Sequence, residues 1–127
     1  MASQRKNRAL TSRFEAKVAY ADITEEAFKA QILKLAGYLG WRTAHFRPAM
    51  TKRGWRTAVQ GDGAGFPDLV LVRPPRLIFA ELKSAKGKPS PEQVAWLSCL
   101  WECERESLET YVWRPADIEE IERRLAR

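Results

Sequence analysis

The sequence has no long apolar run and few of the residues that form disulfides or bind zinc. No stretch approaches the roughly 18 consecutive apolar residues of a membrane-spanning helix, and the amino terminus lacks the apolar core of a signal peptide. We therefore expect a soluble, cytoplasmic protein. Its two cysteines, Cys99 and Cys103, lie in a segment that we expect to be helical, far in sequence from the single histidine, His45. Because a zinc site would need further ligands, we interpret both cysteines as ordinary small side chains.

The chain carries an excess of positive charge that is unevenly distributed. Its 127 residues, 45% apolar and 10% aromatic, are enough for one globular domain, and the net charge is +6. Residues 1–20 carry five Lys and Arg against one acid and residues 42–88 carry ten against three, whereas residues 89–127 carry five against nine. A basic half and an acidic half favour a polyanionic partner, of which nucleic acid is the most common.

Hydrophobic periodicity divides the chain into a basic amino-terminal arm, residues 1–22, and one folded domain, residues 23–127. The domain begins with apolar residues at helical spacing between Thr24, a capping residue, and Gly40, a stop signal. This pattern predicts the first helix.

A second helix is predicted at Ser90, which can cap it, with Pro91 suited to the first helical position and Gln93 completing a capping box. Because a helix between the last two strands permits a parallel crossover, we expect an α/β fold in which helices flank a small mixed β-sheet. The apolar face of this helix would consist of Val94, Leu97, Leu100 and Trp101. The other predicted elements are a strand over residues 42–46, a loop or loose hairpin over residues 51–66, strands over residues 68–72, 77–83 and 109–114, and a final helix over residues 116–127.

Charged residues stand at the ends of the two central predicted strands, where a buried strand should be apolar. Side chains two residues apart on a strand share a face, so Glu81 and Lys83 point the same way. The turn between the strands is short, so the strands should be antiparallel, and Asp68 at the start of one should meet Glu81 at the end of the other. Two carboxylates held close repel one another unless a cation lies between them.

A hard divalent cation such as Mg²⁺ suits this arrangement because it takes carboxylate, carbonyl and water ligands. The main-chain carbonyl of Leu82 is placed to be a third ligand, and Lys83 would lie beside a metal-bound water and a substrate phosphate. The alternative is an ordinary surface pair of Glu81 and Lys83, with an Asp68 that only caps a turn. The aspartate, the tight turn and the apolar strand ending in Glu-Leu-Lys together favour the metal site.

Pro67-Asp68 followed by Glu81-Leu82-Lys83 resembles the PD-(D/E)XK nuclease motif. More narrowly, the chain resembles the VRR-NUC (virus-type replication-repair nuclease) branch over roughly residues 23–125. The matching stretches are GW and a histidine after the first helix, followed by GFPDLVLV, IFAELKSAKGKPSPEQVAWL and VWRPADIEEI. The resemblance implies a restriction-endonuclease-like core and a Mg²⁺- or Mn²⁺-dependent endodeoxyribonuclease that hydrolyses phosphodiester bonds. It also implies branched, flapped or four-way junction DNA as substrate, a homodimer similar to Holliday-junction resolvases, and a place in the DNA repair of a bacterial or phage-infected host cell.

The family usually adds an acid from the first helix, and Glu25 and Glu26 both qualify. Glu25 lies three residues before Phe28 and continues the apolar face, whereas Glu26 lies about 100° further round and should face water. We favour Glu25 as the residue that completes or orients the water shell of the metal; the alternative is that both are solvated first-turn acids. The resemblance also matches Gln93 to a glutamine that positions a water or a phosphate, although helix capping explains this residue equally well.

Several basic and aromatic residues are candidates for DNA contact. His45 stands near a strand end, where a histidine is more often structural, and the resemblance favours substrate contact over proton abstraction. Lys86 and Lys88 follow the catalytic strand in a place suited to hold a phosphate. A mobile clamp on the phosphate backbone, with an indole that stacks on an unpaired base, is predicted from Arg47, Lys52, Arg53, Trp55 and Arg56; a solvated loop is the alternative.

Two other functions compete with the metal-dependent nuclease. A non-catalytic DNA-binding or junction-recognition module on the same fold would need no acids facing phosphate, so Asp68, Glu81 and Lys83 argue against it. A sequence-specific restriction-type nuclease is less favoured, because no separate base-reading element is visible. The sequence is compatible with either one or two metal ions.

Overall fold

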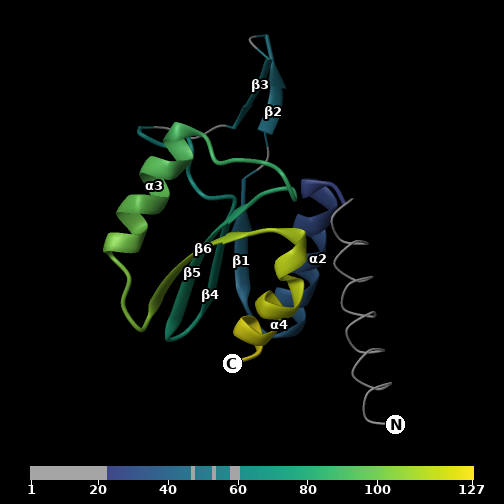
Figure 1. Cartoon of the computed structure of the whole chain (residues 1–127), viewed down its shortest axis with the longest axis vertical. Coiled ribbons are helices and arrows are strands. Elements are labelled where there is room, and N and C mark those ends of the chain that lie inside the picture. Colours follow the sequence, from purple (N-terminus) through teal and green to yellow (C-terminus); the bar gives the residue numbers. More distant parts are fainter. Residues whose placement is uncertain (1–22, 47, 53, 58–60) are drawn as a thin grey trace, which may run out of the picture.

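The computed structural model describes residues 23–46, 48–52, 54–57 and 61–127, with the backbone alone described for residues 48–51 and 55–57. The predicted arm, residues 1–22, lies outside these residues. Within the described part, no helix has the length and apolar character needed to cross a membrane. The elements in chain order (Figure 1) are α2 (Glu25–Tyr38), β1 (Arg42–His45), β2 (Pro48–Thr51), β3 (Gly54–Thr57), β4 (Leu69–Arg73), β5 (Arg76–Leu82), α3 (Pro91–Glu102), β6 (Leu108–Trp113), the 3-10 helix η1 (Pro115–Asp117) and α4 (Ile118–Ala126).

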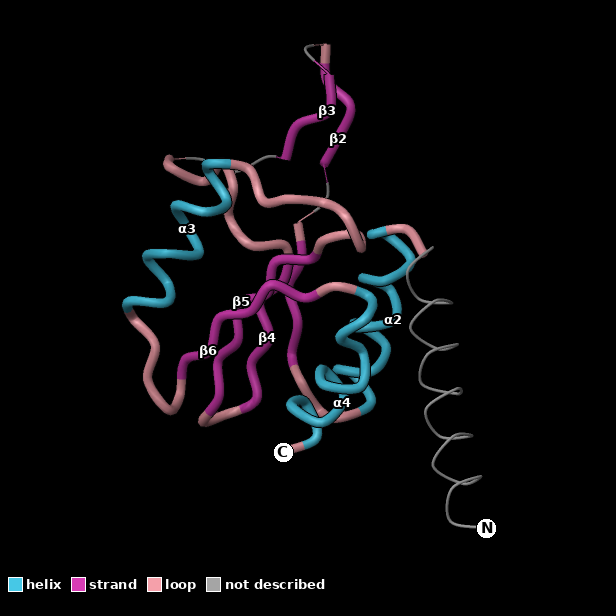
Figure 2. The backbone as a smooth tube through the Cα atoms, viewed as in Figure 1, coloured by secondary structure: helices cyan, strands magenta, loops and turns pink. Residues whose placement is uncertain are grey.

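Four strands form a mixed sheet in the order β1-β4-β5-β6. β4 pairs in antiparallel fashion with both β1 and β5, whereas β5 and β6 are parallel. Helix α3 makes the crossover between the parallel strands, so the predicted α/β fold with a small mixed sheet is confirmed. Strands β2 and β3 form a separate hairpin that extends beyond the end of the sheet (Figure 2). The loop or loose hairpin predicted over residues 51–66 includes β3 but only the last residue of β2.

The main core lies on the face of the sheet that α2 and α4 cover, while α3 lies on the other side (Figure 1). Helix α2 begins at Thr24, whose hydroxyl accepts a hydrogen bond from the Ala27 N–H at 3.1 Å. Alternate residues of β4 and β5 point into this core, as a period of two requires. Its buried members are Phe28, Ile32, Ala36, Trp41, Leu69, Leu71, Ile78, Ala80, Leu82, Trp113, Ile121 and Leu125.

Helix α3 buries less of its predicted apolar face than expected. Leu97 is buried, but Val94 and Trp101 are 48% and 45% exposed. Trp101 covers the free edge of β6 instead: its indole Nε1 donates to the Thr110 carbonyl at 3.0 Å, and the Thr110 N–H donates to Glu104 at 2.9 Å. These two side chains form hydrogen bonds with the N–H and carbonyl groups of Thr110, which an edge strand would otherwise leave unpaired.

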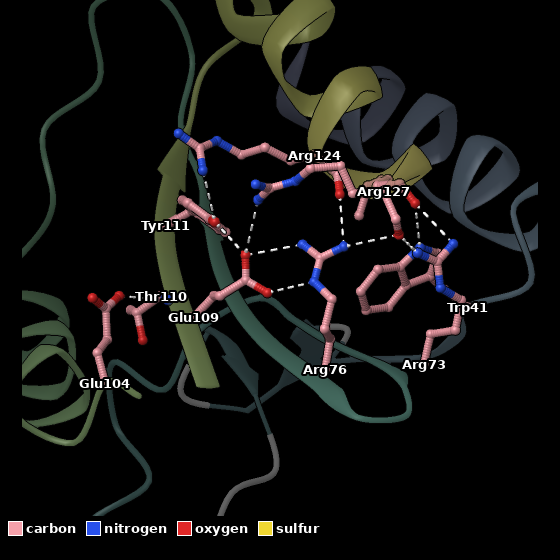
Figure 3. A network of polar contacts seen from close by, with 10 residues as sticks. Trp41, Arg73, Arg76, Glu104, Glu109, Thr110, Tyr111, Arg124 and Arg127 are labelled. Carbon is pink, nitrogen blue, oxygen red and sulfur yellow. Dashed lines mark hydrogen bonds and ion pairs between the residues drawn. The ribbon is translucent and has the colours of Figure 1, made fainter. Parts of the chain in front are cut away.

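Two arginines that flank the β4–β5 turn bind the carboxyl-terminal region of the chain (Figure 3). Arg73 donates to the Leu125 carbonyl at 3.0 Å, and Arg76 donates to the Arg124 carbonyl at 2.8 Å and also pairs with Glu109 of β6 at 2.7 Å. Both guanidinium groups lie over the Trp41 ring, at 4.6 and 4.9 Å from its centroid. These contacts hold α4 against the turn end of β4 and β5, so the charged residues predicted to be functional lie at the opposite end of the two strands.

Candidate active site

Asp68 meets the end of β5 because of the strand register. The antiparallel β4–β5 ladder, continued by one and two residues, puts Asp68 opposite Glu81 and Pro67 opposite Leu82. Proline has no N–H, and the Leu82 N–H donates to the Asp68 carboxylate Oδ2 at 2.9 Å. The predicted meeting of the two strand ends is therefore confirmed.

The loop before β4 is held against the start of α3, which fixes the position of Asp68. Gly65 has a φ of +82°, and a Cβ at this residue would lie 2.5 Å from the carbonyl carbon of Glu92. One residue later, Phe66 packs edge-on against Trp96, with ring centroids 5.0 Å apart. Only glycine permits this approach, so it brings the start of β4 and the first turn of α3 together.

Glu81 is a buried acid with an unusual set of neighbours. Its side chain is 1% exposed, and its Oε1 accepts a hydrogen bond from Gln93 Nε2 at 2.9 Å and lies 3.5 Å from Lys83 Nζ. Its Oε2 is buried and has no hydrogen-bond partner among the described residues. Burial, and then the charge of the nearby Asp68 carboxyl, raise the pKa of Glu81 to about 8, while Lys83 acts in the opposite direction.

The chemistry of these groups fits a hard divalent cation. An unpartnered carboxylate oxygen beside a second carboxylate offers the ligands that Mg²⁺ and Mn²⁺ prefer. Pro67, which lies opposite Leu82, has no N–H. β4 therefore donates no ladder hydrogen bond to the Leu82 carbonyl oxygen. No three His, Cys, Asp or Glu side chains are gathered for a metal in the part of the chain that the structure describes, so such an ion would need carbonyl and water ligands as well.

Gln93 has the predicted capping role and also contacts Glu81, while its role in positioning a water or a phosphate stays a prediction. Its Oε1 accepts a hydrogen bond from the Ser90 N–H at 2.8 Å, while the Gln93 N–H donates to the Ser90 hydroxyl at 3.2 Å, which completes the predicted capping box. Its Nε2 donates to Glu81, so the same side chain joins the start of α3 to the candidate site.

The main chain of Lys83 is held by β6, because the Lys83 N–H donates a hydrogen bond to the Trp113 carbonyl at 3.0 Å.

Comparison with known families agrees with this geometry. A sequence model of the VRR-NUC domain matches residues 12–113, a span that includes every element from α2 to β6. The chain belongs to the VRR-NUC family. A VRR-NUC domain is a nuclease-type DNA-processing domain, and DNA is the substrate that it implies. Comparison with curated proteins and with solved structures gives no significant match.

The two glutamates at the start of α2 differ in their contacts. In this VRR-NUC domain, Glu25 Oε1 accepts a hydrogen bond from the Ser84 N–H at 3.1 Å, just after β5. Glu26 Oε2 instead pairs with Lys29 Nζ at 3.1 Å, and its side chain is 71% exposed. Both glutamates line a pocket of about 150 Å³ with Asp68 and Leu82. The choice of Glu25 as the helix acid stays a prediction, supported by its contact with the residue that follows the Glu81-Leu82-Lys83 segment.

Lys29 lines the same pocket and was not identified from the sequence. It is only 8% exposed, although lysine is usually a surface residue. The available signal was its position three residues after Glu26 and four after Glu25, which puts it on the same side of the helix as both acids. Helical spacing could not show that Asp68 and Leu82, from far along the chain, would line the same pocket as Lys29.

The residues predicted to bind DNA fall into three groups, and their role stays a prediction. His45, at the end of β1, is half-buried and its Nδ1 has no partner among the described residues. Lys52 is exposed between β2 and β3. The backbones of Trp55 and Arg56 lie in β3, whereas Arg47 and Arg53 lie outside the described residues.

Lys86 and Lys88 are exposed on a turn that follows β5. The Gly87 N–H donates to the Ser84 hydroxyl at 3.1 Å, which closes the turn. Arg114, which follows β6, donates to the carbonyls of Ser84 and Gly87, both at 2.7 Å. The two lysines therefore project from a turn that Glu25 anchors to the start of α2 and Arg114 anchors to the end of β6.

Proposed function

We propose that this VRR-NUC domain is a Mg²⁺- or Mn²⁺-dependent endodeoxyribonuclease that hydrolyses phosphodiester bonds. The observation that carries the proposal is the buried Glu81 Oε2, unpartnered among the described residues, on a strand position opposite Asp68. Keeping both carboxyls ionised in such a place is unfavourable unless a cation compensates them. A domain that only bound DNA would gain nothing from two acids beside a phosphate.

Asp68, Glu81 and the Leu82 carbonyl are the proposed ligands of the ion. Glu25 is proposed to orient the water shell, since it lines the same pocket as Asp68 and Leu82. When bound, the ion supplies Lewis acidity at the phosphate and makes a nearby water more acidic. Gln93 holds Glu81 Oε1 by a 2.9 Å hydrogen bond and so restrains the orientation of that carboxylate.

Lys83 is the proposed partner of the attacking water and of the phosphate. Its ammonium, 3.5 Å from Glu81 Oε1, is largely removed from solvent, so it interacts strongly with nearby negative charge. As the water oxygen bonds to phosphorus and the bond from phosphorus to the leaving sugar oxygen breaks, negative charge grows on the phosphate oxygens. Lys83 stabilises that charge and donates a hydrogen bond that keeps the water in line. The water releases its proton to solvent, and the leaving oxygen takes one up.

Branched, flapped or four-way junction DNA is the proposed substrate class, and a homodimer is the proposed assembly. Paired incision at a junction needs two sites at a fixed geometry, which a two-fold dimer supplies. The β2–β3 hairpin, which extends beyond the end of the sheet and carries the exposed Lys52, supports DNA contact at a distance from the scissile phosphate (Figure 1). Lys86 and Lys88 support contact with a phosphate close to the site.

The proposal is tested with labelled linear, flapped, nicked and four-way DNA, each incubated with the protein and Mg²⁺, Mn²⁺ or a chelator. We expect cleavage that requires the metal and that is faster on branched than on linear DNA. Equal cleavage of linear and branched DNA would contradict structure selectivity but leave the nuclease intact. Salt-dependent DNA binding without cleavage under any metal condition would instead favour the non-catalytic DNA-binding module.

A further inference from the structure

Phe46 is an exposed aromatic residue beside the candidate site, and the proposed cleavage makes no use of it. It is 37% exposed and lines the pocket of about 150 Å³ together with Asp68 and Leu82. The β1–β4 ladder, continued by one residue, puts Phe46 opposite Asp68, which itself lies opposite Glu81. An apolar ring therefore stands next to the two acids, in a row across the ends of three strands.

The Phe46 ring is supported by a cluster of aromatic rings. It packs edge-on against Phe66, with centroids 5.4 Å apart and ring planes at 88°. Phe66 in turn packs edge-on with Phe79 and Trp96, at 6.0 and 5.0 Å. In an edge-on pair, one ring covers at most one face of the other, so Phe66 leaves at least one face of Phe46 uncovered. A single exposed apolar residue is common on protein surfaces, but this one is a supported, partly open ring at the site.

The surroundings of the ring favour a nucleotide as its ligand. DNA is the substrate that a VRR-NUC domain implies, and Lys83, Lys86 and Lys88 follow the acidic end of β5. Within a duplex the bases stack on one another, whereas an unpaired base exposes an aromatic face that can stack on a protein ring. An unpaired nucleotide therefore matches both parts of this surface, since its phosphate suits the lysines and its base suits Phe46.

We propose that Phe46 is a DNA-binding residue that stacks on an unpaired base beside the phosphate held at Asp68 and Glu81. This inference rests on the proposed function and gives its preference for branched DNA a physical source. A base that is free at a branch point reaches the ring, whereas a base within a continuous duplex does not.

The first test compares binding to a duplex with a single-stranded flap and to a fully paired duplex of equal length, by fluorescence anisotropy in a chelating buffer. We expect Phe46→Ala to bind the flapped DNA about fivefold or more weakly, and the paired DNA within about twofold of the wild type. Tyr38→Ala is the matched control, because it removes an 89% exposed ring from the other end of α2 and should change neither affinity. Equal weakening of both DNAs in Phe46→Ala would overturn the inference, as would no weakening.

The second test removes the base instead of the ring. An abasic nucleotide is placed in turn at each of the first unpaired positions of the flap. At one position it should weaken wild-type binding by about the same factor as Phe46→Ala and have little effect on that variant, because both changes remove one contact. Equal effects on the two proteins at every position would overturn the inference.

A third comparison keeps the test decisive, since Phe46→Ala also removes the contact with Phe66. Phe46→Leu keeps an apolar side chain against Phe66 but has no aromatic face, whereas Phe46→Tyr keeps the ring. At unchanged circular dichroism, the tyrosine variant should bind flapped DNA like the wild type and the leucine variant more weakly. Equal affinity of these two variants for flapped DNA would overturn the inference.

Failure of this inference is distinguishable from failure of the proposed function. Metal-dependent cleavage by the wild type, together with flap binding that does not depend on the Phe46 ring, would contradict the inference alone. Absence of metal-dependent cleavage of any DNA would contradict the proposed function, while the binding tests, made without metal, would still decide whether Phe46 stacks on a base.

Discussion

The carboxyl group of Glu81 lies between groups that act on it in opposite directions. Burial is the largest cause of its raised pKa, the charge of Asp68 adds to it, and the Lys83 ammonium lowers it. With a pKa of about 8, the group holds a proton at pH 7 in the metal-free protein. A divalent cation that binds here has to displace this proton, so metal affinity should weaken as the pH falls.

The raised pKa of Glu81 predicts how the stability of the metal-free protein depends on pH. The folded protein keeps the proton up to a pKa of about 8, whereas the unfolded chain releases it near the ordinary value of 4.5. The contribution of Glu81 to stability is therefore fully present below pH 4.5 and is lost as the pH rises to about 8. Relative to Glu81→Gln, the wild-type free energy of unfolding should decrease by at most about 1.4 kcal/mol per pH unit across this window.

Urea unfolding of both proteins in a chelating buffer, at several values between pH 5 and pH 8, measures this difference. The neutral amide of Glu81→Gln does not titrate, so subtraction removes the contribution of every other group. A difference that stays constant across the window would contradict the account of the Glu81 environment.

The residue-level prediction from the sequence succeeded where simple geometry was sufficient. Asp68, Glu81 and Lys83 could be brought together because a strand has a period of two and the turn between the strands is short. Lys29 could not be found in this way, because the pocket that it lines is completed by Asp68 and Leu82, which come from far along the chain. The contact between Gln93 and Glu81 depends in the same way on how α3 sits over the sheet.

At the scale of elements, the loop that precedes β4 determines how the site is assembled. Gly65 allows this loop to approach the first turn of α3, which carries Gln93, while Asp68 follows three residues later. The loop therefore connects the two parts of the chain that meet at Glu81.

Gly65→Ala should destabilise the protein and disturb the site. The added Cβ would lie 2.5 Å from the main chain of Glu92, and the φ of +82° is unfavourable for alanine. We expect a loss of about 2 kcal/mol or more in the free energy of unfolding, measured by urea denaturation. Gly37→Ala is the control, because a Cβ at this helical position meets nothing within 4 Å, and it should be neutral or stabilising. Equal stability of the two variants would contradict the proposed role of the loop.

The order and type of the elements followed from local signals, whereas their packing did not. Thr24 and Ser90 cap helices as predicted, and the crossover through α3 makes β5 and β6 parallel. Periodicity identified the apolar face of α3, but it does not say what covers that face. As a result, Val94 is about half exposed, and Trp101 lies along the edge of β6 rather than in a core.

At the scale of the whole molecule, the end of the sheet that carries the candidate site brings together the end of β5, the exposed turn with Lys86 and Lys88, and the hairpin with Lys52 (Figure 2). This arrangement agrees with the excess of basic residues over residues 42–88. Phosphate contacts made by these side chains release counterions, so affinity for DNA should depend steeply on salt.

Loss of Lys86 and Lys88 should weaken DNA binding and flatten its dependence on salt. If each lysine contacts one phosphate, Lys86→Ala/Lys88→Ala should reduce the slope of log affinity against log salt by about two. Fluorescence anisotropy in a chelating buffer measures binding without cleavage. The double variant Lys34→Ala/Arg123→Ala removes as much charge from exposed positions of α2 and α4, and it should change the slope little. The same slope change in both double variants would indicate a general charge effect rather than contact by this turn.

Metal-dependent DNA cleavage by Asp68→Asn, compared with the wild type, tests the central claim most directly. The substitution keeps the size of the side chain and removes the charge that faces Glu81, while Asp62→Asn makes the same change in an exposed loop residue. We predict that Asp68→Asn loses cleavage by about a hundredfold or more with Mg²⁺ or Mn²⁺, at unchanged circular dichroism, and that Asp62→Asn cleaves like the wild type. Cleavage by folded Asp68→Asn at the wild-type, metal-dependent rate would contradict the claim that Asp68 and Glu81 form the catalytic metal site.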